Sequence, residues 1–279
     1  MAIKHVTEWA GLALTRPLVM GILNVTPDSF SDGGRHLDPA RAIAKGRQML
    51  AEGADILDIG GESTRPGAQP VSVADEIARI LPVVKALAID GAVISLDTRN
   101  AATMQAALDA GARIINDVSA LTHDPAALPL VAARGCPVIL MHMRGTPETM
   151  NDYAIYDDLP REIQHELAIR CETAVSAGVK TQNICLDPGF GFAKRGGQNV
   201  GLLRNLSCLA ELGYPLLVAL SRKRFLGEIS YEPEAGKRDT ESLAAGLYAV
   251  TQGAHILRVH DVAGTVRALR VWQRLTEES

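Results

Sequence analysis

Residues 92–118 read AVISLDTRNAATMQAALDAGARIINDV, and this stretch decides the fold. It contains an apolar run (92–97), a segment of helical character and a second apolar run (112–118). Two short apolar runs joined by a helix predict a strand, a helix and a second strand that runs parallel to the first. The first run ends in Asp97, and Asn116 lies near the end of the second. The stretch therefore predicts an α/β protein whose parallel strands end in polar side chains.

The same alternation of apolar run, turn and amphipathic helix recurs along the whole chain. The runs are rich in Val, Ile and Leu and mostly lack polar alternation, which is typical of parallel strands covered on both faces. They are LVMGILNV (18–25), ADILDIG (54–60), AVISLD (92–97), ARIINDV (112–118), PVILMHM (137–143), NICLD (183–187), PLLVAL (215–220) and HILRVH (255–260). Such strands alternating with a similar number of helices favour a closed (β/α)8 TIM barrel over an open doubly wound sheet. No GxGxxG follows the first run, which weakens the dinucleotide-binding form of the open sheet.

The chain is interpreted as a single domain, residues 1–279, with a short N-terminal extension over 1–16. Barrels of this class form one unit at roughly 250 residues. Two leucine-rich stripes predict helices that end at glycines. The first stripe comprises Leu202, Leu206 and Leu209 and ends at Gly213; the second comprises Leu243, Leu247 and Val250 and ends at Gly253.

Composition and charge narrow the class of protein. The formal net charge is -4 and no basic block is present, so we expect no nucleic-acid partner. No window approaches the ~20 consecutive apolar residues of a membrane span, and the charged N-terminal segment does not fit a secretory signal. The four cysteines are far apart and form no CxxC pair, which indicates reduced thiols. We therefore expect a soluble, cytoplasmic protein without a membrane partner.

Polar side chains end every predicted strand. A lone Asp after a strand is more often a helix cap or turn residue than a catalyst. In a barrel, however, all these strand ends meet at one mouth, where such enzymes keep their chemistry, and a crowd of polar groups there is costly without a ligand. The residues are Asn24, Asp58, Glu62, Asp97, Asn116, Asp117, His142, Asp187, Lys223, Arg258 and His260.

These side chains indicate the chemistry of the ligand. Asp97, Asn116 and Asp187 offer acceptors and donors that suit a flat, nitrogen-rich heterocycle. Positive charge for a phosphate or carboxylate comes from Arg65, Lys223, Arg258 and His260. Two glycine-bearing loops, DSFSDGG (28–34) and GGESTRPGA (60–68), are long enough to close over a site. The residues thus predict a barrel enzyme for a polar heterocycle and an anion, without naming its reaction.

Eight sequence blocks, one at each strand end, carry a family resemblance. They are MGILNVTPDSFSDGG (20–34), DIGGESTRPGA (58–68), SLDT (95–98), INDVSA (115–120), MHMRGTP (141–147), LDPGFGF (186–192), SRK (221–223) and RVHD (258–261). Together and in this order they resemble the pterin-binding dihydropteroate synthase family. The blocks cover essentially the whole predicted barrel.

The resemblance implies an activity, a cofactor and an assembly. Members of the family are usually dimeric (β/α)8 barrels that use Mg2+ and are sulfonamide targets. They condense 6-hydroxymethyl-7,8-dihydropterin diphosphate with 4-aminobenzoate and release 7,8-dihydropteroate and diphosphate in folate biosynthesis. The implied partners are thus two small molecules and a second copy of the chain. Early cleavage of the C–O bond would form a pterin cation, which suits the weakly nucleophilic arylamine.

The resemblance also assigns roles to residues. Asp97, Lys223, Arg258 and Arg65 would be catalytic, with Asp97 stabilising the pterin cation. Asn24 would lie at the Mg2+ and the diphosphate, and the carboxylate of 4-aminobenzoate would lie at the start of the helix near Lys223 and Arg224. The substrate-binding set would comprise Thr64, Asp97, Asn116, Met143, Asp187, Phe190, Lys223, Arg258, Val259 and His260.

Three positions depart from the family pattern, and two other functions stay open. Ala219 stands where Gly is usual before SRK, Glu241 where Gly is frequent, and Asn151 where Gln is more usual. A pterin-dependent methyltransferase would share the Asp and Asn side chains at the strand ends, but it should lack the first two loops and the SRK block. A non-catalytic pterin-binding paralogue is the other alternative.

Overall fold

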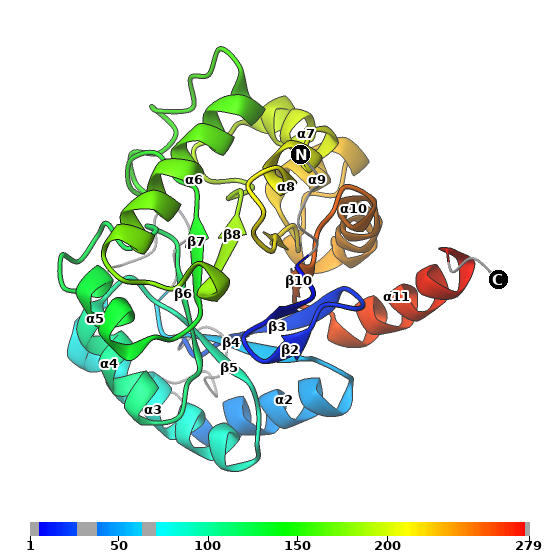
Figure 1. Ribbon diagram of the computed structural model, residues 1–279. Coiled ribbons are helices and arrows are strands. Elements are labelled where there is room, and N and C mark those ends of the chain that lie inside the picture. Colours follow the sequence, from blue (N-terminus) through cyan, green and yellow to red (C-terminus); the bar gives the residue numbers. More distant parts are fainter. Residues whose placement is uncertain (1–5, 27–37, 63–70, 277–279) are drawn as a thin grey trace.

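The computed structural model describes residues 6–26, 38–62 and 71–276, which form an eight-stranded parallel sheet closed into a barrel (Figure 1). Its strands are β3 (Leu18–Asn24), β4 (Ile56–Gly60), β5 (Ile94–Asp97), β6 (Ile114–Asp117), β7 (Val138–Met141), β8 (Ile184–Asp187), β9 (Leu217–Val218) and β10 (Ile256–Val259). Their order is β8-β7-β6-β5-β4-β3-β10-β9. A parallel bridge between Leu186 and Leu216 joins the two ends of the sheet, and the Leu186 N–H donates to the Pro215 carbonyl at 2.9 Å.

Helices surround the barrel and bury their apolar faces against it (Figure 1). They are α2 (Pro39–Ala51), α3 (Val73–Ile89), α4 (Ala101–Asp109), α5 (Ala127–Arg134), α6 (Leu159–Ser176), α7 (Gly196–Arg204), α8 (Ser207–Ala210), α9 (Arg224–Ser230), α10 (Asp239–Thr251) and α11 (Val262–Thr276). The short 3-10 helices Thr181–Asn183 and Ala235–Lys237 precede β8 and α10. The prediction of a single-domain (β/α)8 barrel is confirmed.

One helix prediction is wrong. The stripe of Leu202, Leu206 and Leu209 lies on two helices, because α7 ends at Arg204 and α8 begins at Ser207. The Asn205 side chain donates to the Gly201 carbonyl at 2.9 Å, and its backbone leaves helical geometry at φ -111°. Asn side chains compete with the helix for backbone groups in this way. All three leucines are nevertheless fully buried in the same core.

The barrel interior is apolar at the N-terminal ends of its strands. The inward side chains there form one cluster with Trp9, namely Leu18, Met20, Ile56, Ile114, Ile139, Cys185, Leu217 and Ile256. Trp9 lies on the hairpin formed by β1 (Glu8–Trp9) and β2 (Leu12–Ala13), and its Nε1 donates to the Asn183 carbonyl at 3.1 Å. The hairpin lies in front of the barrel in Figure 1, so Trp9 closes this end. Any ligand of the barrel must therefore enter from the opposite end.

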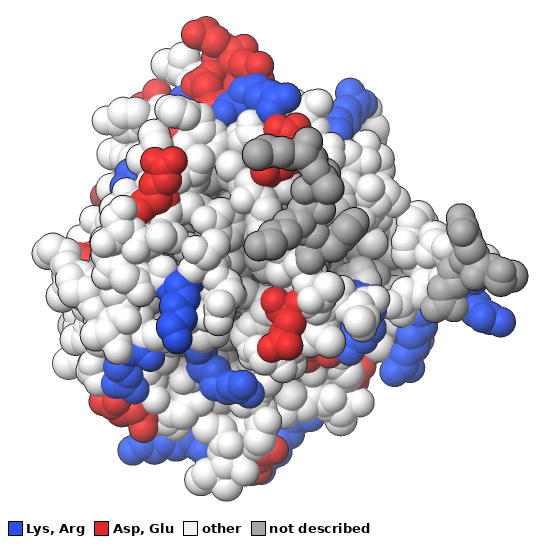
Figure 2. All heavy atoms as spheres, viewed as in Figure 1, with Lys and Arg blue, Asp and Glu red and all other residues white. Residues whose placement is uncertain are grey.

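The surface at the closed end carries both signs of charge. Figure 2 shows Lys and Arg side chains intermingled with Asp and Glu on this face, and neither kind gathers into a broad patch. Within the described ranges, every helix is too short or too polar to span a membrane.

Candidate active site

Strand alternation brings the predicted polar residues into the open end of the barrel. Side chains two residues apart share a face of a strand, so the apolar inward positions of β4, β6, β8 and β10 are each followed by a polar one. The polar side chains reached in this way are Asp58, Asn116, Asp187 and Arg258, and Asp97 occupies the matching position on β5. They form a polar layer directly above the apolar cluster.

Arg258 joins two carboxylates of this layer, Asp58 and Asp97. Its Nε donates to Asp58 Oδ2 at 2.5 Å, and its Nη2 donates to Asp97 Oδ2 at 2.7 Å. Asn116 Nδ2 donates to the same Asp58 oxygen at 3.1 Å. The Asp58 side chain is fully buried, whereas the side chains of Arg258 and Asp97 are 17% and 12% exposed. The exposed edge of this cluster therefore faces the barrel mouth.

Burial and charge set the ionisation of the cluster. The pKa of Asp97 is raised to about 7, mainly by burial; the Arg258 charge opposes this shift and the Asp58 charge adds to it. The pKa of Arg258 is raised by Asp58 and Asp97 against the cost of its burial, so the guanidinium stays charged. Burial also raises the pKa of Asp187, which Lys223 and Arg258 counteract. The barrel mouth thus holds carboxylates whose charge depends on the two cations beside them.

Lys223 and Asp187 occupy the side of the mouth formed by β8 and β9. The Lys223 ammonium lies 4.5 Å from the centroid of the Phe192 ring, within cation–π range. A Cβ on Gly191 would lie 3.3 Å from Lys223 Cδ, so the loop after β8 packs directly against this lysine. The Gly189 N–H donates to Asp187 Oδ1 at 2.7 Å. One loop therefore contacts both predicted ligand-binding residues.

Asn24 and His260 lie at the rim of the same mouth. A Cβ on Gly60 would lie 3.5 Å from Asp97 Cβ and 3.8 Å from Asn24 Oδ1, which places Asn24 beside Asp97. His260 follows β10, and its Nδ1 lies 2.9 Å from Ser221 Oγ, which in turn accepts from the His260 N–H at 3.1 Å. Ser221 thus fixes the orientation of His260, a role that the sequence does not indicate.

Two predicted contact residues, Phe190 and Val259, pack toward the core, and the orientation predicted for Met143 stays a prediction. Phe190 is 1% exposed and stacks on Phe225 of α9, with ring centroids 6.4 Å apart, so its ring faces the core. The Val259 side chain packs in the core between barrel and helices, on the outer face of β10. Met143 is half-buried just beyond β7. Thr64, Arg65 and most of both predicted closing loops lie outside the described residues.

Asp117, at the end of β6, and Glu62, shortly after β4, bind the backbone of neighbouring loops. Asp117 accepts from the backbone N–H groups of Ser119 and Leu121, at 2.7 and 3.0 Å. Glu62 accepts from the Val71 N–H at 3.3 Å and lies 3.7 Å from Arg99. Both carboxylates thus hold the loops that follow their strands, the ordinary role of an acidic residue in a turn.

The departures from the family pattern leave the polar layer intact. Ala219 packs against the apolar cluster inside the barrel. Asn151 contributes its carbonyl to Arg195 at 2.7 Å, a contact that any residue could make. Glu241 lies in the first turn of α10, and its Oε2 is buried without a partner among the described residues. Asp58, Asp97, Asn116 and Arg258 remain hydrogen-bonded to one another.

A fold and a polar layer of this kind define a pterin-binding barrel enzyme, and the "Pterin binding enzyme" family matches residues 20–260. The dihydropteroate synthase of Neisseria meningitidis serogroup C is 47% identical over 267 residues, which are 95% of this chain and 94% of that protein. The Xanthomonas albilineans dihydropteroate synthase with 4-aminobenzoic acid has a TM-score of 0.91 at 48% identity, covering 97% of both chains. The dihydropteroate synthase of the same organism in complex with 7,8-dihydropteroate has a TM-score of 0.88 at 45% identity, and the match covers 96% of this chain and 97% of that one. The chain therefore belongs to the dihydropteroate synthase family.

Proposed function

We propose that the protein is a transferase of folate biosynthesis that joins 6-hydroxymethyl-7,8-dihydropterin diphosphate to 4-aminobenzoate, giving 7,8-dihydropteroate and diphosphate. The observation that carries this proposal is the hydrogen-bonded layer of Asp58, Asp97, Asn116 and Arg258 at the barrel mouth of a chain from this family. A pterin-dependent methyltransferase would explain the pterin site, but not the full-length similarity to dihydropteroate synthases. A non-catalytic paralogue would share that similarity, and an assay of turnover tests it.

The polar layer suits a pterin that becomes positively charged. Asn116 and Asp187 offer an amide and a carboxylate to the ring NH groups. As the C–O bond to the diphosphate breaks, positive charge grows on the pterin methylene, and the Asp97 carboxylate stabilises that state more than the starting one. Arg258 then moves its positive charge from Asp97 toward the departing diphosphate. In this proposal, Arg258 pairs first with the Asp97 carboxylate and then with the diphosphate, so its charge is paired throughout.

The Mg2+ requirement is part of the proposal and rests on Asn24. Mg2+ prefers oxygen ligands and usually keeps several waters and substrate phosphate oxygens. The described residues contain no group of three acidic, His or Cys side chains that could hold a metal alone, whereas the amide oxygen of Asn24 lies at the mouth beside Asp97. The donor set thus fits an ion that arrives with the diphosphate. Bound there, the ion neutralises charge on the leaving group.

The second substrate is placed at the start of α9. Lys223 is the N-cap residue of this helix, and no side chain in the described part of the protein caps its first N–H groups. The carboxylate of 4-aminobenzoate could accept from these groups, with the amine directed toward the pterin bound beside Lys223. His260, whose Nδ1 lies 2.9 Å from Ser221 Oγ, and Arg258 would bind the diphosphate. Arg65 and Thr64, outside the described residues, keep their assigned roles as predictions.

The decisive experiment supplies the purified chain with both substrates and Mg2+ and measures 7,8-dihydropteroate by chromatography. We expect product that depends on both substrates. A parallel reaction with a methylated folate and a corrinoid acceptor tests the methyltransferase alternative. Pterin binding without product in the first reaction would instead favour the non-catalytic paralogue.

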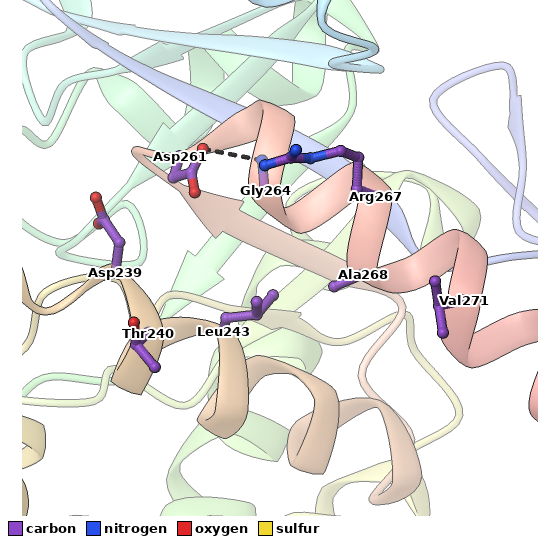
Figure 3. Close-up of a pocket in the computed structure, with 8 residues that line it drawn as sticks. All are labelled: Asp239, Thr240, Leu243, Asp261, Gly264, Arg267, Ala268 and Val271. Atoms are coloured by element: carbon purple, nitrogen blue, oxygen red, sulfur yellow. Dashed lines mark hydrogen bonds between the residues drawn. The ribbon is translucent and has the colours of Figure 1, made fainter.

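We further propose that the protein forms a homodimer through α10 and α11. A hollow of about 430 Å3 lies between these helices on the outside of the barrel (Figure 3). Apolar Leu243, Ala268 and Val271 line it together with charged Asp239, Asp261 and Arg267, so the surface can pair with its own copy. Val271 is 61% exposed, and Tyr248 and Leu275 on the same two helices are 43% and 78% exposed.

Light scattering tests the assembly. We expect a mass twice that of the 29.7 kDa chain for the parent, and a monomer for Val271→Glu, which places a charge in the apolar part of the hollow. The matched control is Ile89→Glu, because Ile89 is 86% exposed at the end of α3. A monomeric parent would contradict the dimer.

The proposal also places the enzyme in the cytoplasm, and the four free cysteines agree with a reducing compartment.

A further inference from the structure

A buried lysine, Lys194, lies beneath the loop that contacts Lys223. Lys194 is 5% exposed, and its ammonium reaches three acceptors: Phe192 O at 2.8 Å, Gly189 O at 3.0 Å and His142 Nδ1 at 3.0 Å. An ammonium group has three hydrogens, so every donor of Lys194 is used. Two of the three bonds hold backbone carbonyls of the loop after β8, the loop that packs against Lys223.

The third bond connects Lys194 to the loop after β7. His142 Nε2 lies 3.0 Å from Glu166 on α6, which also pairs with the Arg144 guanidinium. Glu166 accepts from Nε2, so Nδ1 carries the lone pair that accepts from Lys194. Burial and the nearby Lys194 charge lower the pKa of His142 to about 4, which keeps the imidazole neutral near pH 7. The chain Lys194–His142–Glu166–Arg144 therefore has one consistent set of donors and acceptors.

A second buried side chain holds the same loop from its other side. Asn199 on α7 is 1% exposed; its Oδ1 accepts from the Gly191 N–H at 2.7 Å and its Nδ2 donates to the Lys194 carbonyl at 3.1 Å. Gly189 and Gly191 have φ angles of 70° and 76°, and a Cβ on Gly189 would lie 2.0 Å from the His142 carbonyl. Buried side chains thus hold the loop backbone at Gly189, Gly191 and Phe192.

We propose that Lys194 is a positioning residue for the pterin half of the reaction: its ammonium holds the loop of residues 188–193 against the barrel, and the loop in turn holds Lys223 and Asp187 in place. This inference rests on the proposed function, since it concerns the same site. Lys194 does not touch the substrate itself. Its removal should weaken pterin binding more than the binding of 4-aminobenzoate, which is assigned to backbone N–H groups of α9 and not to the Lys223 side chain.

The charge of Lys194 is part of this role. A neutral amine has two hydrogens and would lose one of the three bonds. Burial lowers the pKa of Lys194 to about 7, with Lys223 and Arg144 acting in the same direction and Asp187 and Glu166 opposing them. His142, the remaining titratable neighbour, stays neutral in this range. The fully bonded form of the loop should therefore predominate on the acidic side of about pH 7.

The test compares Lys194→Met with the parent and with Lys180→Met, which removes an exposed lysine before the 3-10 helix Thr181–Asn183. Calorimetry with the pterin diphosphate gives Kd from about pH 6 to about pH 9, and steady-state kinetics give KM for each substrate. We expect Lys194→Met to raise the pterin Kd about tenfold or more at the acid end and to leave the 4-aminobenzoate KM within about twofold. Lys180→Met should match the parent.

The pH dependence separates positioning from a merely structural role. The ratio of the variant Kd to the parent Kd should fall as the parent Lys194 loses its proton and one of its three bonds, whereas other titrating groups are common to both proteins. Hydrogen exchange of the 189–193 amides should be faster in Lys194→Met even if this variant does not turn over. A ratio independent of pH, equal loss of affinity for both substrates, or unchanged exchange would overturn the inference. A parent that binds pterin without making product would contradict the proposed function alone.

Discussion

Replacing Asp58 with Asn tests how the charge of Asp58 affects Arg258 and the ionisation of Asp97. This carboxylate accepts from Arg258 Nε at 2.5 Å and from Asn116 Nδ2 at 3.1 Å, and its side chain is fully buried. Its charge also raises the pKa of Asp97. The substitution keeps the size of the side chain and removes only the charge. It should therefore change both the stability of the fold and the ionisation of Asp97, in directions that the geometry specifies.

The loss of folding stability in Asp58→Asn depends on the ion pair that Arg258 retains with Asp97. Removing one partner of a buried ion pair costs roughly 3–5 kcal/mol when the other charge is left alone. Arg258 retains Asp97 at 2.7 Å, so the loss should be smaller, about 2 kcal/mol. At roughly 2 °C per kcal/mol for a chain of this size, Tm should fall by about 4 °C. The matched control is Asp90→Asn, which removes an exposed partner of Arg47 and should leave Tm unchanged.

The effect on catalysis is read from the pH profile. The pKa of Asp97 is raised to about 7, mainly by burial, and the carboxylate is the form that stabilises the cation, so kcat/KM should rise with pH along an acidic limb near pH 7. Without the charge of Asp58, the pKa of Asp97 falls and this rise should move to lower pH. Thermal unfolding and kcat/KM across the pH range give both quantities. An acidic limb that stays in place or moves upward would refute the coupling of Asp58 and Asp97.

Three further predictions concern the substrates. Asp97→Asn should keep most of the pterin affinity and lower kcat on the order of a hundredfold or more, and unchanged turnover would exclude the cation-stabilising role. Arg258→Ala should weaken diphosphate binding by about 2 kcal/mol, roughly thirtyfold, and equal affinity in calorimetry would exclude it as an anion ligand. It should also move the acidic limb to higher pH, since Asp97 loses the cation that lowers its pKa. Sulfonamides, as mimics of 4-aminobenzoate, should raise its KM without lowering kcat, and purely noncompetitive inhibition would contradict the shared pocket.

Much of the fold and of the site could be predicted from the sequence. Short Val-, Ile- and Leu-rich runs separated by helices specify parallel strands, and each run of β4, β5, β6, β8 and β10 carries a polar residue where the strand ends. Because the C-terminal ends of the strands of a barrel meet at one mouth, the sequence predicts that Asp97, Asn116, Asp187 and Arg258 lie together. The reaction was indicated only by the family resemblance of the motif blocks, since no single strand end distinguishes a pterin from another heterocycle.

Which of the inward side chains bind one another was decided only by the tertiary structure. Arg258 is 200 residues from Asp58 and 161 from Asp97, and they meet because closing the barrel places β10 beside β3, with β4 and β5 following. Lys194 gave no signal in the sequence, because its role depends on three acceptors from two loops. Phe190 has the motif of a ligand contact, yet its ring packs on Phe225. Alternation along a strand fixes the face that a side chain occupies, whereas its partners depend on the register and packing of elements far apart in the chain.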